Sequence, residues 1–311
     1  MDLDTDAMAA SLRGLALGDG FGGRWFWQGP HRAAAMIEDR RTPTEQPFFY
    51  SDDTALALCV VRMLLTGRRI VQSHLAALFG ATYLADPDRQ YGYGMATLLP
   101  KLHEYPEGFA TMAAALFDGT GSLGNGSAMR VAPLGAFFHA DLDRVVEQAA
   151  LSASVTHTHP EAVDGAIAVA VGAALAAAGR GQAPEPAGTL LMRVADLLPE
   201  GVIRSGVEAA AALDPGTPAW KAADVLGNGQ RIRCSDTVPF ALWTAAVHQD
   251  DYEAALWATA AGLGDVDTTC AITGGIVAAR TGIGAAPAPW LKLREPLPDW
   301  AESLGEPATA A

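Results

Sequence analysis

The chain has 311 residues, half of them hydrophobic, and its 35 acidic side chains outnumber its 21 Lys and Arg side chains to give a net charge of −14. It is long enough to bury a core, but its acidity and the lack of a basic run argue against binding to a nucleic-acid duplex or a membrane. Its 3 cysteines form no C-x-x-C pair and no signal peptide precedes Gly14. We therefore expect a cytoplasmic protein with buried, reduced thiols. We also expect the protein to be a monomer.

The first predicted helix has apolar residues at helical spacing between Met8 and Ala16, which is typical of a helix that faces a core. The glycines at its end fit G-x-G-x-x-G, but a dinucleotide fingerprint follows a strand, so we reject that match. Residues 28–50 lack periodicity and contain Gly29 and three prolines. We expect a long surface loop there, of the kind that often serves as a lid.

Two adjacent carboxylates stand at the start of the next predicted helix, at about 53–66. The stretch is Ser51-Asp52-Asp53-Thr54, and an apolar run from Ala55 to Leu65 follows it. Adjacent carboxylates repel each other, so crowding them is costly unless a cation neutralises their charge. Another helix is predicted at about 70–85.

Two glycine-containing segments come next. Tyr91-Gly92-Tyr93-Gly94 places glycines beside aromatic rings, so that a backbone can approach a ligand on which a ring stacks; a plain turn between helices is the alternative. Gly124-Asn125-Gly126-Ser127 precedes another helix, and backbone N–H groups at such a start form an anion site suited to a pyrophosphate. Helix capping by Asn125 or Ser127 is the alternative there.

Two histidines, His157 and His159, are candidate metal ligands. Thr158 and Glu161, however, have the spacing of a capping box, with Pro160 in the first turn of the helix that follows. We therefore expect His159 to be structural. From the residues alone, His157 is best explained as a core histidine with its hydrogen bonds satisfied.

The helix predicted from Glu161 to Ala178 is apolar almost all round, which indicates burial at the centre of a bundle. Its apolar run, 166–178, is too short to span a membrane. Further helices are predicted at about 189–199, 202–213 and 251–262, and no strand-like alternation is present. The sequence thus predicts one all-α domain over residues 1–311, with a peripheral tail from about 296 to 311.

The acidic helix start occurs a second time, at Gly264-Asp265-Val266-Asp267-Thr268-Thr269, before an apolar segment. On a helix, Asp265 and Asp267 would point to nearly opposite sides, so we expect both in the turn that precedes it. A helix cap needs only one acceptor, whereas this turn offers two carboxylates and two hydroxyls.

If the two acidic stretches meet in space, they form an all-oxygen cage of the kind that Mg²⁺ prefers, with Mn²⁺ or Ca²⁺ as alternatives. Four carboxylates would balance two such ions. The spacing alone leaves both metal ligation and simple capping open.

These motifs resemble those of the ADP-ribosylglycohydrolase family, which includes the dinitrogenase reductase-activating glycohydrolase and hydrolases that remove ADP-ribose from arginine or serine. The stretch from Asp265 to Thr268 looks like the GDxDT signature of that family, and the stretch from Ser51 to Thr54 looks like its (T/S)DDT signature. The resemblance covers about residues 10–295. The other matching segments, in the order of the family, are Gly14 to Asp19, Tyr91 to Gly94, Gly124 to Arg130, Thr156 to Glu161 and Ser235 to Pro239.

The resemblance implies a compact orthogonal multi-helix bundle and a hydrolase that cleaves the glycosidic bond between ADP-ribose and an acceptor. It also implies two Mg²⁺ ions, held by Ser51, Asp52, Asp53, Asp265, Asp267 and Thr268. Asp52 or Asp267 is our candidate general base. The substrate-binding residues that it implies are Tyr91, Gly92, Tyr93, Gly94, Asn125, Gly126, Ser127, Met129 and His157.

The sequence departs from the family at one position. A glutamate of the family lies shortly after the Gly-Asp pair, and the matching residue here is Phe26. Either an acid of the following loop, which is Glu38, Asp39 or Glu45, takes its role, or the protein does without it. The alternative function is therefore a catalytically inactive ADP-ribose-binding or structural protein of the same fold.

Overall fold

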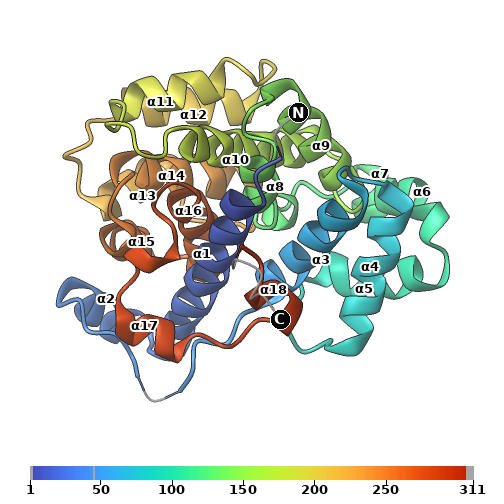
Figure 1. Ribbon diagram of the computed structural model, residues 1–311, viewed down its shortest axis with the longest axis horizontal. Coiled ribbons are helices and arrows are strands. Elements are labelled where there is room, and N and C mark those ends of the chain that lie inside the picture. The colour runs from blue at the N-terminus through green and yellow to red at the C-terminus, as the bar shows by residue number, and fades with distance from the viewer. Residues whose placement is uncertain (1–2, 45, 306–311) are drawn as a thin grey trace, which may run out of the picture.

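The computed structural model describes residues 3–44 and 46–305. Within these residues the chain is helical and forms no β-strand; two isolated β-bridges join Phe48 to Arg294 and Gly124 to Arg233. The predicted all-α fold is confirmed. Figure 1 shows α3 to α7 on one side of α1 and most of the C-terminal helices on the other.

The helices of the first half of the chain are α1 (Thr5–Gly23), α2 (Pro30–Glu38), α3 (Asp52–Gly67), α4 (Gln72–Ala85), α5 (Tyr93–Glu104), α6 (Phe109–Ala114), α7 (Leu116–Gly119), α8 (Ala132–Phe137) and α9 (Leu142–Ser154). Those of the second half are α10 (Pro160–Ala178), α11 (Ala187–Ala195), α12 (Val202–Ala212), α13 (Ala219–Leu226), α14 (Cys234–Val247), α15 (Tyr252–Ala260), α16 (Val266–Thr281), α17 (Ala288–Leu293) and α18 (Asp299–Glu302). Short 3₁₀ turns are η1 (Arg24–Trp27), η2 (Pro106–Gly108), η3 (Asn125–Ser127) and η4 (Ile283–Ala285).

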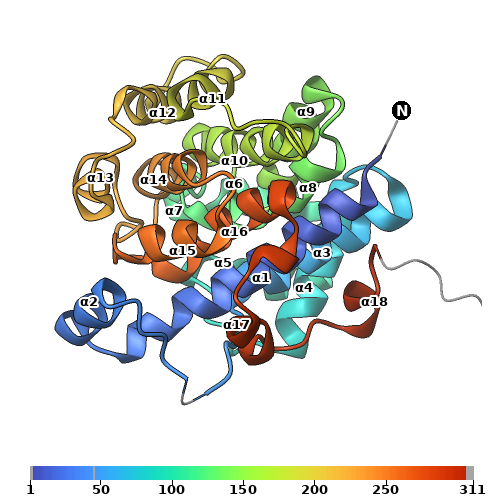
Figure 2. The same ribbon diagram turned by 60° about the vertical axis from the view of Figure 1, so that its left-hand side comes forward.

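The helices α1 and α16 lie side by side and antiparallel, as Figures 1 and 2 both show. Glycines recur every fourth residue on the face of α1 that meets α16, and an added Cβ atom at any of them would collide with a backbone carbonyl of α16. The three close approaches are Gly14 to Gly274, Gly18 to Cys270 and Gly22 to Val266. Because residues i and i+4 share one helix face, this spacing lets the two backbones touch. It also brings the C-terminal end of α1 against the first turn of α16.

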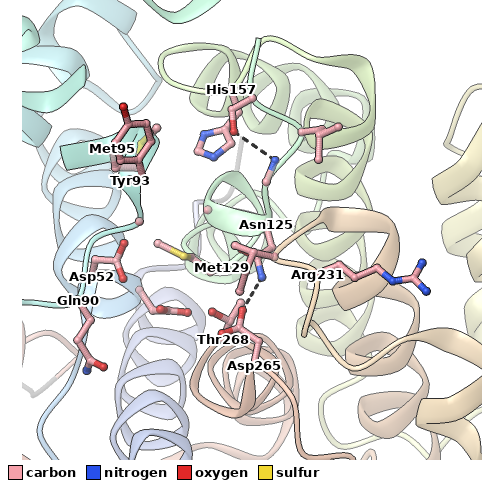
Figure 3. Close-up of a pocket in the computed structure, with 18 of the residues that line it drawn as sticks. Asp52, Gln90, Tyr93, Met95, Asn125, Met129, His157, Arg231, Asp265 and Thr268 are labelled. Atoms are coloured by element: carbon pink, nitrogen blue, oxygen red, sulfur yellow. Dashed lines mark hydrogen bonds between the residues drawn. The ribbon is translucent and has the colours of Figure 1, made fainter. Parts of the chain in front are cut away.

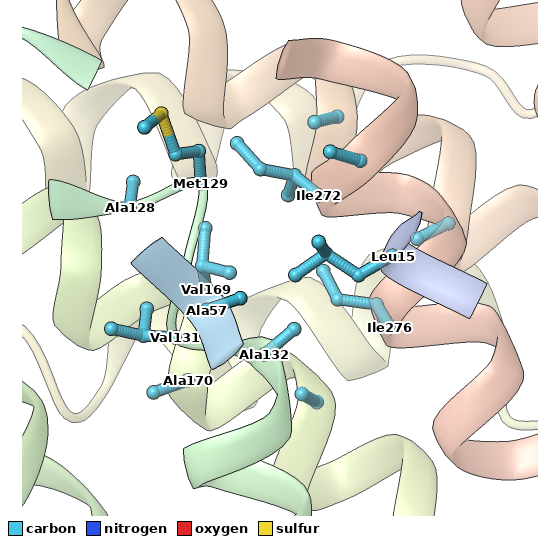
Figure 4. Close-up of a cluster of buried hydrophobic side chains, with 14 of the residues drawn as sticks. Leu15, Ala57, Ala128, Met129, Val131, Ala132, Val169, Ala170, Ile272 and Ile276 are labelled. Carbon is cyan, nitrogen blue, oxygen red and sulfur yellow. The ribbon is translucent and has the colours of Figure 1, made fainter. Parts of the chain in front are cut away.

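The core of the fold is formed around α10 and α16. Figure 4 shows side chains of α1, α3, α8, α10 and α16 and of the segment before α8 meeting in one cluster. The helix α10 is long and apolar enough to cross a membrane, but 83% of its most apolar window is buried inside the protein. Its bounds agree closely with the helix expected from Glu161 to Ala178, since it begins at Pro160 and ends at Ala178. Its small residues let neighbouring helices approach closely.

The prediction of a long surface loop at residues 28–50 is partly wrong, because this segment contains the helix α2. Ala33, Met36 and Ile37 are buried along one side of α2. Their i, i+3, i+4 spacing is a helical signal, which the surrounding prolines and glycine obscured. The end of the chain also packs: Leu297 and Ala301, in the expected tail, are buried, whereas residues 306–311 lie outside the described residues.

The capping box predicted at Thr158 and Glu161 is also wrong. The N-cap of α10 is His159, whose Nδ1 accepts from the backbone N–H of Glu161 at 3.2 Å. The Glu161 carboxylate instead accepts from Arg233 (Nη2–Oε2, 2.7 Å) and from the backbone N–H of Ser235 (3.1 Å). The role of His159 is therefore structural, as expected, although it acts through a different contact.

Candidate functional site

A pocket of about 630 Å³ opens where the first turns of α3 and α16 meet. Figure 3 shows Asp52 on one side of it, Asp265 and Thr268 at one end, and His157 at the opposite end. Its lining also includes the start of α5, the segment 120–126 and the pair Arg231 and Ile232. The pocket therefore joins segments from most of the length of the chain.

At the start of α3, a serine is the helix cap. The Ser51 hydroxyl oxygen accepts from the backbone N–H of Asp53 at 3.2 Å and donates to Asp53 Oδ2 at 2.8 Å. Asp53 Oδ1 is buried and has no hydrogen-bond partner within the described residues. Asp52, the first residue of the helix, lines the pocket. Neither carboxylate is therefore used as the cap, and Asp53 keeps one unsatisfied oxygen.

Asp19 on α1 completes this helix start, and sequence reasoning assigned it no role. Its carboxylate accepts from the backbone N–H of Ser51 (2.9 Å to Oδ2) and from both the N–H and the hydroxyl of Thr54 (3.1 and 2.6 Å). Asp19 is fully buried. Burial raises its pKa to about 6, although the hydrogen bonds from Ser51 and Thr54 act in the opposite direction and lower the pKa. An acid on the core-facing side of a helix, beside Gly18, was the signal that could have identified it.

At the start of α16, Asp265 occupies the N-cap position but makes no side-chain cap bond. Its Oδ2 accepts from Asn125 Nδ2 at 2.6 Å. Asp267 is the second residue of the helix, so the expectation that both acids precede it is wrong. Both can line the pocket because the Asp265 backbone is not helical (φ −86°, ψ 70°), which releases its side chain from the rotation of the helix.

The two helix starts form one acidic cluster. Asp19, Asp53 and Asp267 each offer a carboxylate oxygen, and these oxygens lie within 4.8 Å of one another. Burial raises the pKa of Asp53 and of Asp267 well above the ordinary value, and repulsion from neighbouring carboxylates adds to the rise. In the part of the chain that the structure describes, no Lys, Arg or His side chain forms an ion pair with these groups.

These residues fit a hard divalent cation. Buried carboxylates repel one another and pay for desolvation unless a positive charge joins them. The unsatisfied Oδ1 of Asp53 provides a free ligand atom within the cluster. An all-oxygen donor set is the kind that Mg²⁺, Mn²⁺ and Ca²⁺ prefer.

Apart from Arg231, the rest of the pocket lining carries no charged side chain, and we call it the neutral wall. Of the expected substrate-binding residues, it contains Gly92, Tyr93, Gly94, Asn125, Gly126, Met129 and His157. Tyr91 lies outside the lining and packs edge-on against the ring of Tyr83, with ring centroids 4.9 Å apart. Ser127 also lies outside, because its hydroxyl donates to the carbonyl oxygen of Ala162 at 2.8 Å.

His157 lies directly against the Gly124–Gly126 turn. A Cβ atom added at Gly126 would lie 3.0 Å from His157 Cε1, so the glycine leaves the space that the imidazole ring fills. Burial and the charge of Arg130 lower the pKa of His157 to about 3. The ring is therefore neutral at physiological pH.

Part of the lining carried no signal in the sequence. Phe117 and Asp118 adopt consecutive left-handed conformations (φ 52° and 58°), and the Phe117 ring borders the pocket. Arg231 and Ile232 come from the loop before α14, and Figure 3 shows the Arg231 side chain directed away from the pocket centre. None of these belongs to a short motif.

The acids of the 28–50 segment are not near the pocket in the described structure. Glu38 and Asp39 are exposed, and Asp39 pairs with Arg41 at 2.9 Å. Neither lines the pocket, and Glu45 lies outside the described residues. Phe26, at the position of the family glutamate, is 44% exposed in η1.

Comparison with known proteins agrees with the motifs. A family model described as ADP-ribosylglycohydrolase matches residues 2–310. The chain is 35% identical over 165 residues to ADP-ribosylhydrolase ARH3 of Homo sapiens, which covers 53% of this chain and 45% of that protein. It is 33% identical over 183 residues to ADP-ribosylhydrolase ARH3 of Gallus gallus, covering 55% of this chain and 49% of that protein. The chain thus spans about half the length of the curated relatives that it matches.

A solved structure shares the fold. It is named as an ADP-ribosylglycohydrolase-related protein complex and aligns with a TM-score of 0.65 at 24% sequence identity. The alignment covers 94% of this chain and 93% of that chain. The likeness confirms the expected architecture of the helical bundle.

Proposed function

This chain belongs to the ADP-ribosylglycohydrolase family, and from that premise we propose that it is a Mg²⁺-dependent hydrolase that cleaves the glycosidic bond between ADP-ribose and an acceptor. The observation that carries the proposal is the cluster of buried carboxylates that opens into a pocket whose remaining lining, apart from Arg231, is uncharged. ADP-ribose is an anion, so it can enter an acidic pocket only where cations balance both sets of charges. The monomeric state and the cytoplasmic location stay predictions.

We place two Mg²⁺ ions at the acidic cluster, with Mn²⁺ or Ca²⁺ as alternatives. The proposed ligands are Ser51, Asp52, Asp53, Asp265, Asp267 and Thr268, and Asp19 contributes a further oxygen to the cluster. When bound, such cations orient the ribose hydroxyls and lower the pKa of a coordinated water. The protein itself supplies the fixed positions of the carboxylates at two helix starts.

Asp52 is our first candidate for the general base. Its carboxylate projects toward the pocket in Figure 3, and burial followed by repulsion from Asp267 raises its pKa. A raised pKa brings a carboxylate closer to the operating pH, where it takes a proton more readily. A water that gives its proton to Asp52 can attack the anomeric carbon as the bond to the acceptor breaks, and the proton can return to the departing acceptor. Asp267 is the second candidate, but its Oδ1 already accepts from the N–H of Thr268 at 2.8 Å.

The neutral wall is suited to the rest of the ligand. The pocket volume of about 630 Å³ lies within the range typical of small-molecule sites. The Gly124–Gly126 turn brings backbone N–H groups to the pocket, where they can receive a pyrophosphate, and the exposed ring of Tyr93 stands at the rim where an adenosine or ribose could stack. We propose arginine, serine, a nucleic-acid base or a small ADP-ribose ester as candidate acceptors.

The test is a panel of these ADP-ribosylated substrates, each incubated with Mg²⁺ and with a chelator, with free ADP-ribose measured by chromatography. We expect release from at least one substrate with Mg²⁺ and none with the chelator. Calorimetric titration with ADP-ribose should accompany the panel. ADP-ribose binding without release from any substrate would instead identify a catalytically inactive binding member of the family, the function that the Phe26 departure favours.

A further inference from the structure

Arg130 is a buried cation with no carboxylate partner among the described residues. It is fully buried, and its guanidinium lies over the ring of Phe79, 4.4 Å from the centroid. Its Nη2 donates to the carbonyl oxygen of Ser152 and to Thr156 Oγ1, both at 2.9 Å, whereas Nε and Nη1 have no partner. Burying a guanidinium is costly. The hydrogen bond from Arg130 to Thr156 indicates what this buried guanidinium does.

Thr156 connects Arg130 to the pocket. The Thr156 hydroxyl oxygen lies 2.7 Å from His157 Nδ1. A guanidinium can only donate, so the Thr156 oxygen accepts from Arg130 and its hydroxyl proton remains available for Nδ1. If Nδ1 carried the proton instead, the hydroxyl proton of this fully buried threonine would lose its acceptor, which is unfavourable. The hydrogen bonds thus favour a ring with its proton on Nε2.

The other ring nitrogen faces the ligand side. A Cβ atom added at Gly126 would lie 3.1 Å from His157 Nε2, and one added at Gly124 would lie 3.5 Å from it. Both glycines line the pocket, and Figure 3 shows the imidazole ring at one end of it. The Nε2–H group is therefore placed beside the turn that we assign to the pyrophosphate.

We propose that Thr156, oriented by Arg130, is a positioning residue that locks His157 in the Nε2–H tautomer and so presents a neutral hydrogen-bond donor to an oxygen of the bound ligand. The tautomer is a property of the protein alone. Its use in holding ADP-ribose rests on the proposed function.

The tautomer can be read directly from the ¹⁵N chemical shifts of the His157 ring in the free protein, with the signals assigned by their loss in His157→Gln. We expect one species that is protonated at Nε2 and unprotonated at Nδ1. In Thr156→Val, which keeps the side-chain shape but removes the hydroxyl, we expect mixed tautomers and ADP-ribose affinity lower by about tenfold, the equivalent of one net hydrogen bond. Thr156→Ser should restore both properties.

Thr244→Val is the matched control, because Thr244 is a buried threonine whose hydroxyl bonds within a separate cluster with Thr259 and Thr273. It should leave the His157 signals and the ADP-ribose affinity unchanged. A parent protein that shows the Nε2–H tautomer but binds no ADP-ribose would refute the proposed function and leave the tautomer assignment standing. A parent that binds ADP-ribose with the proton on Nδ1 would overturn the inference, as would a Val variant with parental signals and affinity.

Discussion

The two acidic helix starts look alike in sequence but are built differently. At α3, Ser51 caps the helix and Asp19 reaches across from α1 to bind the N–H groups of Ser51 and Thr54. At α16, Asp265 occupies the cap position, makes no cap bond and is held by Asn125. The first start is capped without its own carboxylates, whereas at the second the N-cap side chain makes no cap bond and Asp267 accepts one N–H group of the first turn, that of Thr268.

The difference shows that capping does not account for the acids of the pocket. The chain does contain an ordinary acidic cap: Asp251 at the start of α15 accepts from the backbone N–H of Ala254 at 2.9 Å. By contrast, Asp52 and Asp53 leave capping to Ser51, and Asp267 accepts only the N–H of its neighbour Thr268. Carboxylates that are buried together, without a capping role, are explained by a cation that they hold.

The largest expected effect comes from removing one charge from the cluster. In Asp52→Asn, Asp265→Asn or Asp267→Asn, Mg²⁺ loses an anionic ligand, so we expect turnover to fall on the order of a hundredfold or more. Mg²⁺ should no longer raise the melting temperature. Without Mg²⁺, the variants should be as stable as the parent or more stable, because one repulsive charge is gone. Thermal melts with Mg²⁺ and with chelator, together with the ADP-ribose release assay, measure all three.

Asp251→Asn is the matched control for these variants. Asn caps a helix about as well as Asp, so the change should be nearly neutral in stability, in Mg²⁺ response and in turnover. If the pocket variants behaved like Asp251→Asn, the two helix starts would be ordinary caps and the metal site would not exist.

The second prediction concerns Asp19, whose loss should lower the stability of the protein, unlike the loss of a charge at the other acids. In Asp19→Ala, the N–H groups of Ser51 and Thr54 and the Thr54 hydroxyl lose their acceptor in a fully buried place. We expect the free energy of unfolding to fall by about 2–4 kcal/mol even with a chelator present. Urea unfolding measures it, and Asp19→Asn, which keeps one acceptor oxygen, should lose less. Equal stability of Asp19→Ala and the parent would contradict its role in closing α3.

The two helix starts also show which parts of the fold and of the site can be predicted from the sequence. Helical periodicity gave the all-α fold, and the repeated acidic stretches marked both helix starts, because these signals are local. Asp19 was missed because its hydrogen-bond partners lie 32 to 35 residues away along the chain. Tyr91 and Ser127 could not be separated from their pocket-lining neighbours, since only packing decides which side chains face inward.

The third prediction concerns pH. Burial raises the pKa of Asp19 from 3.8 to about 6, so between these values the folded metal-free protein binds more protons than the unfolded chain. Its contribution to stability is therefore present at low pH and is lost as pH rises through about 6. Because Mg²⁺ must displace protons from the cluster, its affinity should increase from pH 5 to pH 7 by up to about tenfold per pH unit for each proton displaced. Calorimetry in two buffers of different ionisation enthalpy measures both the affinity and the protons released, and an affinity independent of pH would refute the shift.

The smallest expected effect is a change in ADP-ribose affinity when a glycine of the neutral wall is replaced, and two glycines of the same pocket can be compared. A Cβ atom at Gly126 meets His157 Cε1 at 3.0 Å, whereas one at Gly92 meets nothing within 4 Å. In Gly126→Ala the imidazole must shift by a few tenths of an ångström, so we expect ADP-ribose affinity to fall by less than about tenfold, less than the value of one full hydrogen bond. Gly92→Ala should leave the affinity near that of the parent, because its backbone angles (φ −62°, ψ 155°) suit any residue. Neither variant touches the carboxylates, so Mg²⁺ should raise the melting temperature of both as it does for the parent.

Calorimetric titration of the two variants side by side shows why Gly126 is a glycine. Equal losses of affinity would mean that the glycines serve ligand approach in general. A loss confined to Gly126→Ala would show that this glycine is required because the His157 ring lies against it.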